Sequence, residues 1–326
     1  MRAFGKFLGR VLLALLLLIA ALWLFAPEAP MDTDIAFDER SLPRDLDDWL
    51  AEREAQFSDI VPGTEKRIVW AGRPRQRTGV AVVYLHGFAA TSEEIRPLPE
   101  RVAAALGANL FFTRLAGHGR GGAVLAEATA GDWLEDTAEA LAIGRAIGDE
   151  VLVIASSTGG TLAAIALTDA RLGYAVKGIV FLSPSFRLRG WDAWVLTAPL
   201  ARHWAPVLIG PEIGVPPVSA AQARFWTNSY PTAAAFPMAA LVAHARGLSY
   251  SGVTTPALFA FSLADEVVSP AATRAVAARW GGPAELLPVT LGPGDDPSGH
   301  VLAGDTLSPG QTEAMVAAIL EWMERL

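Results

Sequence analysis

From residue 80 onwards, short aliphatic runs alternate with longer segments of helical periodicity. Each run has the length of a strand, and each longer segment repeats its apolar residues at helical spacing. Strands that alternate with helices predict a mostly parallel sheet covered by helices on both faces. The predicted strands are residues 80–85, 109–113, 151–155, 178–182, 257–262 and 285–289, with a further candidate at 67–70, and the predicted helices are residues 94–106, 130–147, 158–170, 270–279 and 311–325.

The alternation is interrupted at about residues 186–250, a stretch that contains several prolines and four tryptophans. An aromatic insertion between two late strands indicates a cap over the carboxyl edge of the sheet. We interpret the tryptophans as candidate substrate-binding residues; a structural excursion without substrate contact is the alternative. They are Trp191, Trp194, Trp204 and Trp226.

Composition limits the classes of partner. Hydrophobic residues make up 52% of the 326 residues and charged residues 18%, so the chain can bury a large core. The net charge of −8 argues against nucleic acid, because phosphate binding needs a concentrated basic face. Without cysteine, the chain has no disulfide, cysteine nucleophile or thiolate metal site. The histidines are dispersed along the chain, so we expect no metal and no cofactor.

The N-terminus has the pattern of a targeting segment. The basic residues Arg2, Lys6 and Arg10 precede an unbroken apolar run over residues 11–26, as in a secretory signal or a signal anchor. The run is short compared with the roughly 20 residues of a bilayer crossing. We expect residues 1–30 to form a signal anchor or signal peptide, with a retained anchor favoured and a buried core helix as the alternative.

This pattern also implies a location. The basic flank should stay in the cytoplasm, which puts the catalytic part on the extracytoplasmic side. We therefore expect a protein anchored in a membrane through residues 11–26, or a secreted or periplasmic protein if the signal is cleaved. Residues 31–65 are expected to form a linker and a short amphipathic helix, because Leu46, Trp49 and Leu50 have roughly helical spacing.

Residues 151–160 predict a nucleophile turn. An aliphatic strand runs into small residues and then into a helix, which is the context of a small-x-Ser-x-Gly elbow. The positions two before and two after the serine approach each other closely at such a turn, and here they are Ala155 and Gly159. Ser157 is therefore the candidate nucleophile. Ser156 is a competitor, and a packed strand–helix junction without chemistry is the alternative.

A serine hydroxyl needs a general base that a third group orients. At elbows of this type, the acid and then the histidine follow the serine in the chain. Of the five histidines, only His300 lies beyond the last predicted strand. Asp265 ends the short loop after the predicted strand at residues 257–262, with Glu266 as a competitor and a helix cap as its alternative role. The sequence thus predicts a triad of Ser157, Asp265 and His300.

A glycine-containing loop follows the predicted strand at residues 80–85. Gly87 allows close approach of the backbone there. The amides of Phe88 and Thr158 are expected to form an oxyanion hole, supported by the N-terminal end of the helix that begins at Thr158. His86 is expected to serve the geometry of this loop rather than proton transfer.

Together these motifs resemble the α/β-hydrolases, and within them the branch of monoacylglycerol lipases, carboxylesterases and S33-type serine aminopeptidases. The resemblance covers about residues 66–325. It implies an α/β-hydrolase domain over residues 66–326 that contains the cap insertion, and a structural role for His118. The motifs are Leu85-His86-Gly87-Phe88, Gly117-His118-Gly119, the Ser157 elbow, Asp265-Glu266-Val267-Val268 and Ser298-Gly299-His300.

The motifs and the resemblance imply a serine hydrolase that cleaves carboxylic esters through an acyl-enzyme. A cap rich in tryptophan and proline favours apolar or amphipathic substrates, such as medium-chain esters, monoglycerides or lysophospholipids. One alternative is an S33-like peptidase, in which Glu212 of the cap would bind a substrate amine. The others are an acyltransferase and a non-catalytic binding protein on the same scaffold. The expected partner is a small-molecule ester or lipid.

Overall fold

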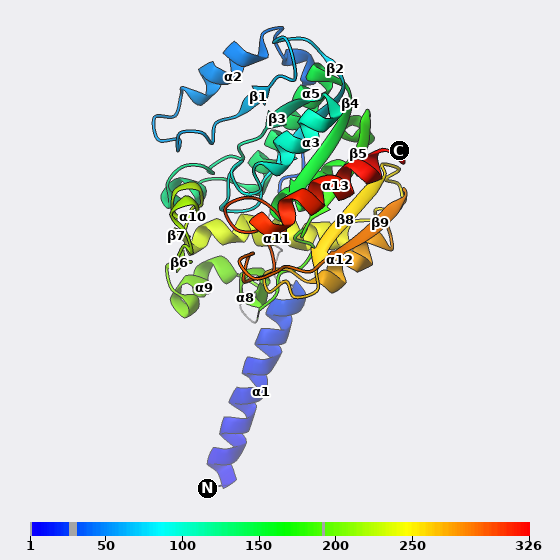
Figure 1. Ribbon diagram of the computed structural model, residues 1–326. Helices are drawn as coiled ribbons and strands as arrows, with labels where there is room; N and C mark the ends of the chain where they lie inside the picture. Colours follow the sequence, from blue (N-terminus) through cyan, green and yellow to red (C-terminus); the bar gives the residue numbers. More distant parts are fainter. Residues whose placement is uncertain (1, 26–30, 191–192) are drawn as a thin grey trace.

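The centre of the structure is a seven-stranded sheet with the strand order β1-β3-β2-β4-β5-β8-β9 (Figure 1). The computed structural model describes residues 2–25, 31–190 and 193–326. β1 pairs with β3 in antiparallel orientation, and all other pairings in this sheet are parallel, which confirms the predicted mostly parallel α/β sheet. The strands are β1 (Arg67–Val69), β2 (Thr78–Leu85), β3 (Asn109–Phe112), β4 (Gly148–Ser156), β5 (Val176–Leu182), β8 (Ala257–Ser262) and β9 (Ala284–Val289).

Helices cover both faces of this sheet. The last six residues of β4 are all buried, as expected for a parallel strand with helices on both sides. α3 and α13 pack against each other on one face, whereas α5, α6 and α12 pack on the other face around Trp133 and Phe181. The helices are α3 (Leu98–Leu106), α5 (Ala130–Ile147), α6 (Thr158–Ala166), α12 (Pro270–Ala277) and α13 (Thr312–Met323).

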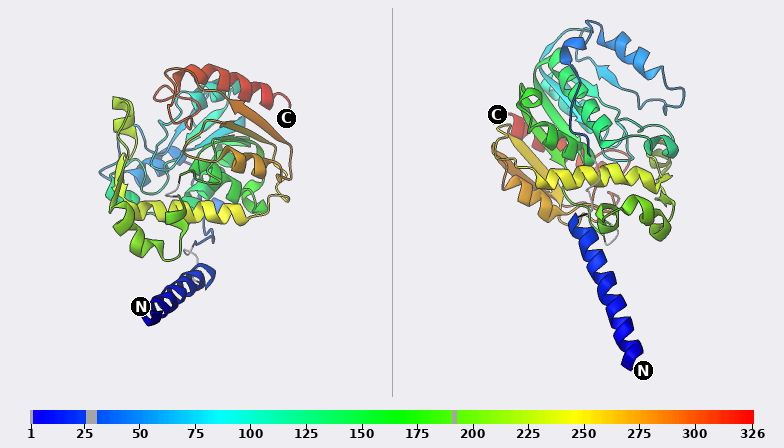
Figure 2. Two further views of the ribbon diagram at one scale, coloured as in Figure 1. Left: turned by 90° about the horizontal axis from the view of Figure 1, so that it is seen from below. Right: turned by 180° about the vertical axis from the view of Figure 1, so that it is seen from behind.

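The insertion after β5 forms a cap beside the carboxyl ends of the strands (Figures 1 and 2). The Thr227 amide of the cap donates a hydrogen bond to the Ala89 carbonyl over 2.7 Å. The Tyr230 ring packs edge-on against Phe88, with 5.3 Å between the ring centroids. These contacts attach the cap to the loop that follows β2. The cap elements are α8 (Ala193–Thr197), α9 (Ala201–Ile209), β6 (Glu212–Gly214), α10 (Ala220–Phe225), β7 (Ser229–Pro231) and α11 (Ala235–Gly247).

The N-terminal helix α1 (Arg2–Phe25) extends away from the rest of the molecule (Figures 1 and 2). No helix in the described part of the chain is both long and apolar enough to cross a membrane. The predicted membrane or signal character of residues 1–30 is therefore not confirmed, and residues 26–30 of that segment lie outside the described residues. The charges of Lys6 and Arg10 leave an apolar run shorter than the roughly 20 residues of a bilayer crossing.

The segment over residues 31–44 lies along α5. The Phe37 amide donates to the Glu135 carboxylate over 2.9 Å, and Arg145 pairs with Glu39 at 2.7 Å. The stretch that the sequence presents as a linker is thus held against the α/β body by polar contacts. The remaining elements are η1 (Glu39–Ser41), α2 (Leu46–Glu54), α4 (Gly122–Leu125), α7 (Ala170–Gly173), η2 (Thr232–Ala234) and η3 (Pro309–Gln311).

Candidate active site

Ser157 lies at a sharp turn between β4 and α6. Its backbone has φ 49° and ψ −115°, a conformation that L-residues rarely adopt, and its amide donates to the Leu182 carbonyl over 2.9 Å. A Cβ atom at Gly159 would lie only 2.3 Å from the Leu85 carbonyl oxygen. Only glycine fits at that position, whereas the methyl group of Ala155 is accommodated in full burial. The residue sizes around Ser157 therefore follow from the closeness of β2 to this turn.

The structure brings the three predicted triad residues together. His300 Nε2 lies 2.9 Å from Ser157 Oγ, and His300 Nδ1 lies 2.9 Å from Asp265 Oδ2. The other carboxylate oxygen of Asp265 accepts the amides of Val267 and Val268, both over 2.8 Å. The Asp265 carboxylate is thus fixed in orientation. An Nδ1–H that donates to it leaves Nε2 free to accept the Ser157 proton.

The surroundings of His300 favour its protonated form. Burial lowers the pKa of His300, but the hydrogen bond and charge of Asp265, with the charges of Glu94 and Asp296, outweigh burial. The net result is a pKa above the ordinary value of 6.5. An imidazole with a raised pKa stabilises the proton that it takes from a serine.

Asp296 organises the loop that carries His300. Its Oδ2 atom accepts the amides of His300 and Val301, over 3.0 and 2.7 Å, and the Ser298 hydroxyl over 2.7 Å. Asp296 received no role in the sequence analysis. The run Asp-Pro-Ser-Gly before the histidine is a turn signal that points to such a carboxylate.

The same loop is joined to the turn that precedes α3. The Asp305 amide donates to the Arg96 carbonyl over 2.9 Å. Gly304 has a φ of 103°, and a Cβ atom there would lie 2.6 Å from the Ile95 Cα atom. The two backbones are therefore in direct contact.

The predicted oxyanion donors lie on both sides of the nucleophile. Phe88 follows Gly87, whose Cα lies so close to Ser157 that an added Cβ atom would be 3.1 Å from the serine Cβ. Thr158 begins α6 immediately after the serine. Neither the Phe88 amide nor the Thr158 amide donates a hydrogen bond to another described residue. Both amides are thus available for an oxygen held beside Ser157.

Comparison with known proteins establishes the family. The family described as "Serine aminopeptidase, S33" matches residues 76–287, which is more than half of the chain. The chain belongs to this family. No curated protein sequence matches it.

Solved structures share the fold of this S33 family member. One is that of the metagenome-derived lipolytic enzymes LipS and LipT, with 23% identity over 82% of this chain and 100% of that chain, and a TM-score of 0.65. The Paleococcus ferrophilus monoacylglycerol lipase has 15% identity, 79% and 98% coverage and a TM-score of 0.54. A soluble variant of the Saccharomyces cerevisiae monoglyceride lipase has 12% identity, 82% and 97% coverage and a TM-score of 0.58. The predicted α/β-hydrolase fold and the resemblance to this branch are confirmed.

His86, in the loop after β2 of this S33 protein, is held in one neutral form. Burial lowers its pKa to about 4. Its Nε2 atom accepts the Leu115 amide over 3.1 Å, so Nδ1 carries the hydrogen and donates to the Gly87 carbonyl over 2.9 Å. His86 therefore connects the loop after β2 with the loop after β3, in line with the expected role in loop geometry.

Ser185 is a contact of the nucleophile that sequence reasoning missed. Its Oγ atom lies 3.1 Å from Ser157 Oγ, and it is buried. Ser157 has one hydroxyl proton, which points to His300 when the imidazole is neutral. Ser185 must then be the donor in its bond with Ser157. Its position three residues beyond β5, the neighbour of β4 in the sheet, is the one signal in the sequence.

The structure separates the cap tryptophans into two groups. Trp204 packs against a small apolar cluster of the cap itself, and the exposed Trp194 lies beside it with 6.3 Å between ring centroids. Trp226 packs against the apolar cluster of α3 and α13, and Trp191 lies outside the described residues. Their predicted contact with substrate stays a prediction.

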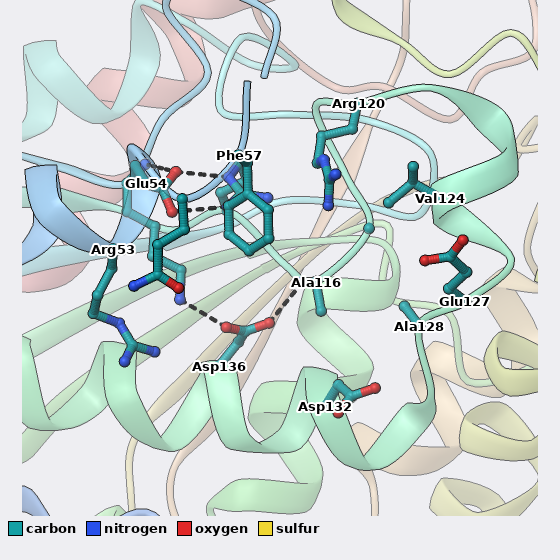
Figure 3. Close-up of a pocket in the computed structure, with 14 residues that line it drawn as sticks. Arg53, Glu54, Phe57, Ala116, Arg120, Val124, Glu127, Ala128, Asp132 and Asp136 are labelled. Carbon is teal, nitrogen blue, oxygen red and sulfur yellow. Dashed lines mark hydrogen bonds and ion pairs between the residues drawn. The ribbon is translucent and has the colours of Figure 1, made fainter. Parts of the chain in front are cut away.

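A cavity of about 310 Å³ lies among α2, α4 and α5 (Figure 3). Its lining does not include the triad, and its buried cations are paired, with Arg114 on Glu54 and Lys66 on Asp136, each at 2.7 Å. Among the described residues, no cluster of three or more histidine or carboxylate side chains is placed to hold a metal ion. The residues that could perform chemistry thus gather at Ser157.

Proposed function

We propose that this protein is a serine hydrolase that cleaves carboxylic esters of apolar or amphipathic substrates. The observation that carries the proposal is the continuous chain of hydrogen bonds from Asp265 through His300 to Ser157 Oγ. Membership of the S33 family and the lipolytic enzymes among the proteins of the same fold support it.

The reaction follows from the positions of the donors and acceptors. His300 Nε2 takes the Ser157 proton as the serine oxygen attacks the ester carbonyl, and Asp265 stabilises the imidazolium. The amides of Phe88 and Thr158 bind the oxyanion, and each such donor typically contributes about a hundredfold or more to the rate. His300 then protonates the leaving alcohol. Water, activated by the same imidazole, hydrolyses the acyl-enzyme and releases the acid.

The rival substrate class is peptides, because the family carries an aminopeptidase description. An aminopeptidase needs a carboxylate that faces the reacting centre and binds the substrate amine. The candidate Glu212 is exposed on β6, at the edge of the cap sheet. This position favours ester substrates without an amine.

A direct comparison of substrates tests the proposal. We expect nitrophenyl esters of short and medium chain length to be hydrolysed with a kcat/KM at least about 100-fold above that of aminoacyl-anilides, because Glu212, the candidate partner of the amine, is exposed on β6. Ser157→Ala serves as the blank in both assays. A higher kcat/KM for the anilides would assign the protein to the peptidases, and no turnover of either class together with no labelling by a fluorophosphonate would favour the non-catalytic reading.

We also propose that residues 11–26 attach the protein to a membrane or direct its export, with the catalytic body on the extracytoplasmic side. The side chains of Leu12 and Leu16 are exposed on α1, and basic residues precede them. We expect the full-length chain in the membrane fraction, or outside the cytoplasm after cleavage. A Leu13→Glu/Leu16→Glu variant should remain in the cytoplasm, and an intact wild-type chain found there would contradict the proposal.

A further inference from the structure

A buried carboxyl group lies behind the loop that carries Phe88. Glu94 is only 3% exposed. Its Oε2 atom accepts the Gly87 amide and the Tyr84 hydroxyl, both over 2.8 Å. A buried carboxylate destabilises a fold unless such donors compensate for the lost water. None of the steps proposed above uses this group.

Glu94 holds Gly87 against the nucleophile. A Cβ atom on Gly87 would lie 2.7 Å from Glu94 Oε1 and 3.1 Å from Ser157 Cβ, so the Gly87 backbone fills the space between carboxyl group and serine. The hydrogen bond from the Gly87 amide fixes the peptide on one side, and the contact with Ser157 limits it on the other. The next amide along the chain is that of Phe88, so its position depends on the Glu94 contact.

The charge of Glu94 also affects the pKa of His300, the proposed general base. Burial raises the pKa of Glu94 by more than the hydrogen bonds from Gly87 and Tyr84 lower it, so the net shift is upward. Glu94 is among the groups that raise the pKa of His300, after the larger effect of Asp265. The carboxyl group is therefore connected to both halves of the site, the oxyanion loop through a hydrogen bond and His300 through its charge.

We propose that Glu94 is a positioning residue for the reaction: it holds the Gly87–Phe88 peptide where the oxyanion needs a donor. The inference rests on the proposed ester hydrolysis at Ser157. A merely structural carboxylate would affect stability alone. A positioning carboxylate changes kcat and the pH dependence as well.

Two variants of Glu94 separate the effect of side-chain length from the effect of charge. Glu94→Gln keeps the shape and removes the charge. We expect kcat to fall about tenfold or more with KM within twofold, since part of one oxyanion donor's contribution is lost. The acid limb of kcat/KM should move to lower pH, because His300 loses a neighbouring negative charge and its pKa falls. Glu94→Asp keeps the charge but shortens the side chain, so kcat should fall while the acid limb stays.

The matched control is Glu139→Gln, which removes an equally buried carboxylate on α5, where Glu139 contacts Lys66. It should lower the Tm without changing kcat or the acid limb. Rates are normalised to the folded fraction by fluorophosphonate titration of Ser157, so partial unfolding does not count as lost catalysis. Glu94 variants with kcat and acid limb like the wild type would overturn the inference.

The failure of the proposed function would look different from the failure of this inference. If Ser157→Ala kept its activity in the same assay, ester hydrolysis at Ser157 itself would be wrong, and the positioning role of Glu94 with it. If Ser157→Ala were inactive and the Glu94 variants were unchanged, only the positioning role would be refuted.

Discussion

Replacement of Ser157 by alanine is expected to lower kcat for nitrophenyl esters by about a million-fold, close to the loss seen when a serine nucleophile is removed from a complete triad. The Oγ atom lies 2.9 Å from His300 Nε2, and alanine leaves the base without a nucleophile to activate. The fold should persist, because Ser157 bonds to Leu182 and Ser185 through its backbone. The measurement is the steady-state rate together with covalent labelling by a fluorophosphonate.

Ser156→Ala is the informative companion variant. Ser156 is the last residue of β4, and the structure places Ser157 Oγ, not the Ser156 hydroxyl, at hydrogen-bond distance from His300 Nε2. We expect this variant to keep the label on Ser157. Labelling that is lost in Ser156→Ala and retained in Ser157→Ala would transfer the nucleophile role to Ser156.

Asp265→Asn is expected to lower kcat on the order of 10⁴-fold while the protein stays folded. The Val267 and Val268 amides hold one carboxylate oxygen of Asp265, and an asparagine oxygen can keep both bonds. The amide nitrogen then faces His300 Nδ1 as a donor. The imidazole must accept there and carry its hydrogen on Nε2, where it can no longer take the Ser157 proton. Rates at the pH optimum and a Tm measurement check both statements.

Glu266→Gln provides the control for this prediction. It removes the same charge one residue further along the chain, but Glu266 is exposed and contacts the His300 loop only through its backbone amide. We expect its kcat within about twofold of the wild type, as for most surface substitutions. A large loss in Glu266→Gln with a small one in Asp265→Asn would make Glu266 the triad acid.

Much of the sheet could be predicted from the sequence, because parallel strands buried on both faces appear as aliphatic runs and turns carry small residues. The Ser157 elbow is such a case, since closeness to the Leu85 carbonyl requires Gly159. Local composition also placed Asp265 after β8 and His300 after β9. The short strands β6 and β7 were missed because three residues are too few to show a period.

The remaining site residues depend on contacts between distant segments. Glu94 resembles the start of a helix in the sequence, and only the turn before α3 brings it to Gly87. Ser185 meets Ser157 because β4 and β5 are neighbours in the sheet, and the register that brings their ends together is not visible in the sequence. The four tryptophans are the opposite case, in which the sequence suggests site residues whose contact with substrate stays a prediction. A high aromatic content does not distinguish packing within a cap from contact with a substrate.

The contact between Gly304 and Ile95, with the bond from Asp305 to Arg96, has a consequence for redesign. The loop that carries the base and the turn that supports the oxyanion loop form one mechanical unit, so their substitutions should combine non-additively. An engineer who wished to reshape this site would therefore have to exchange the two segments together.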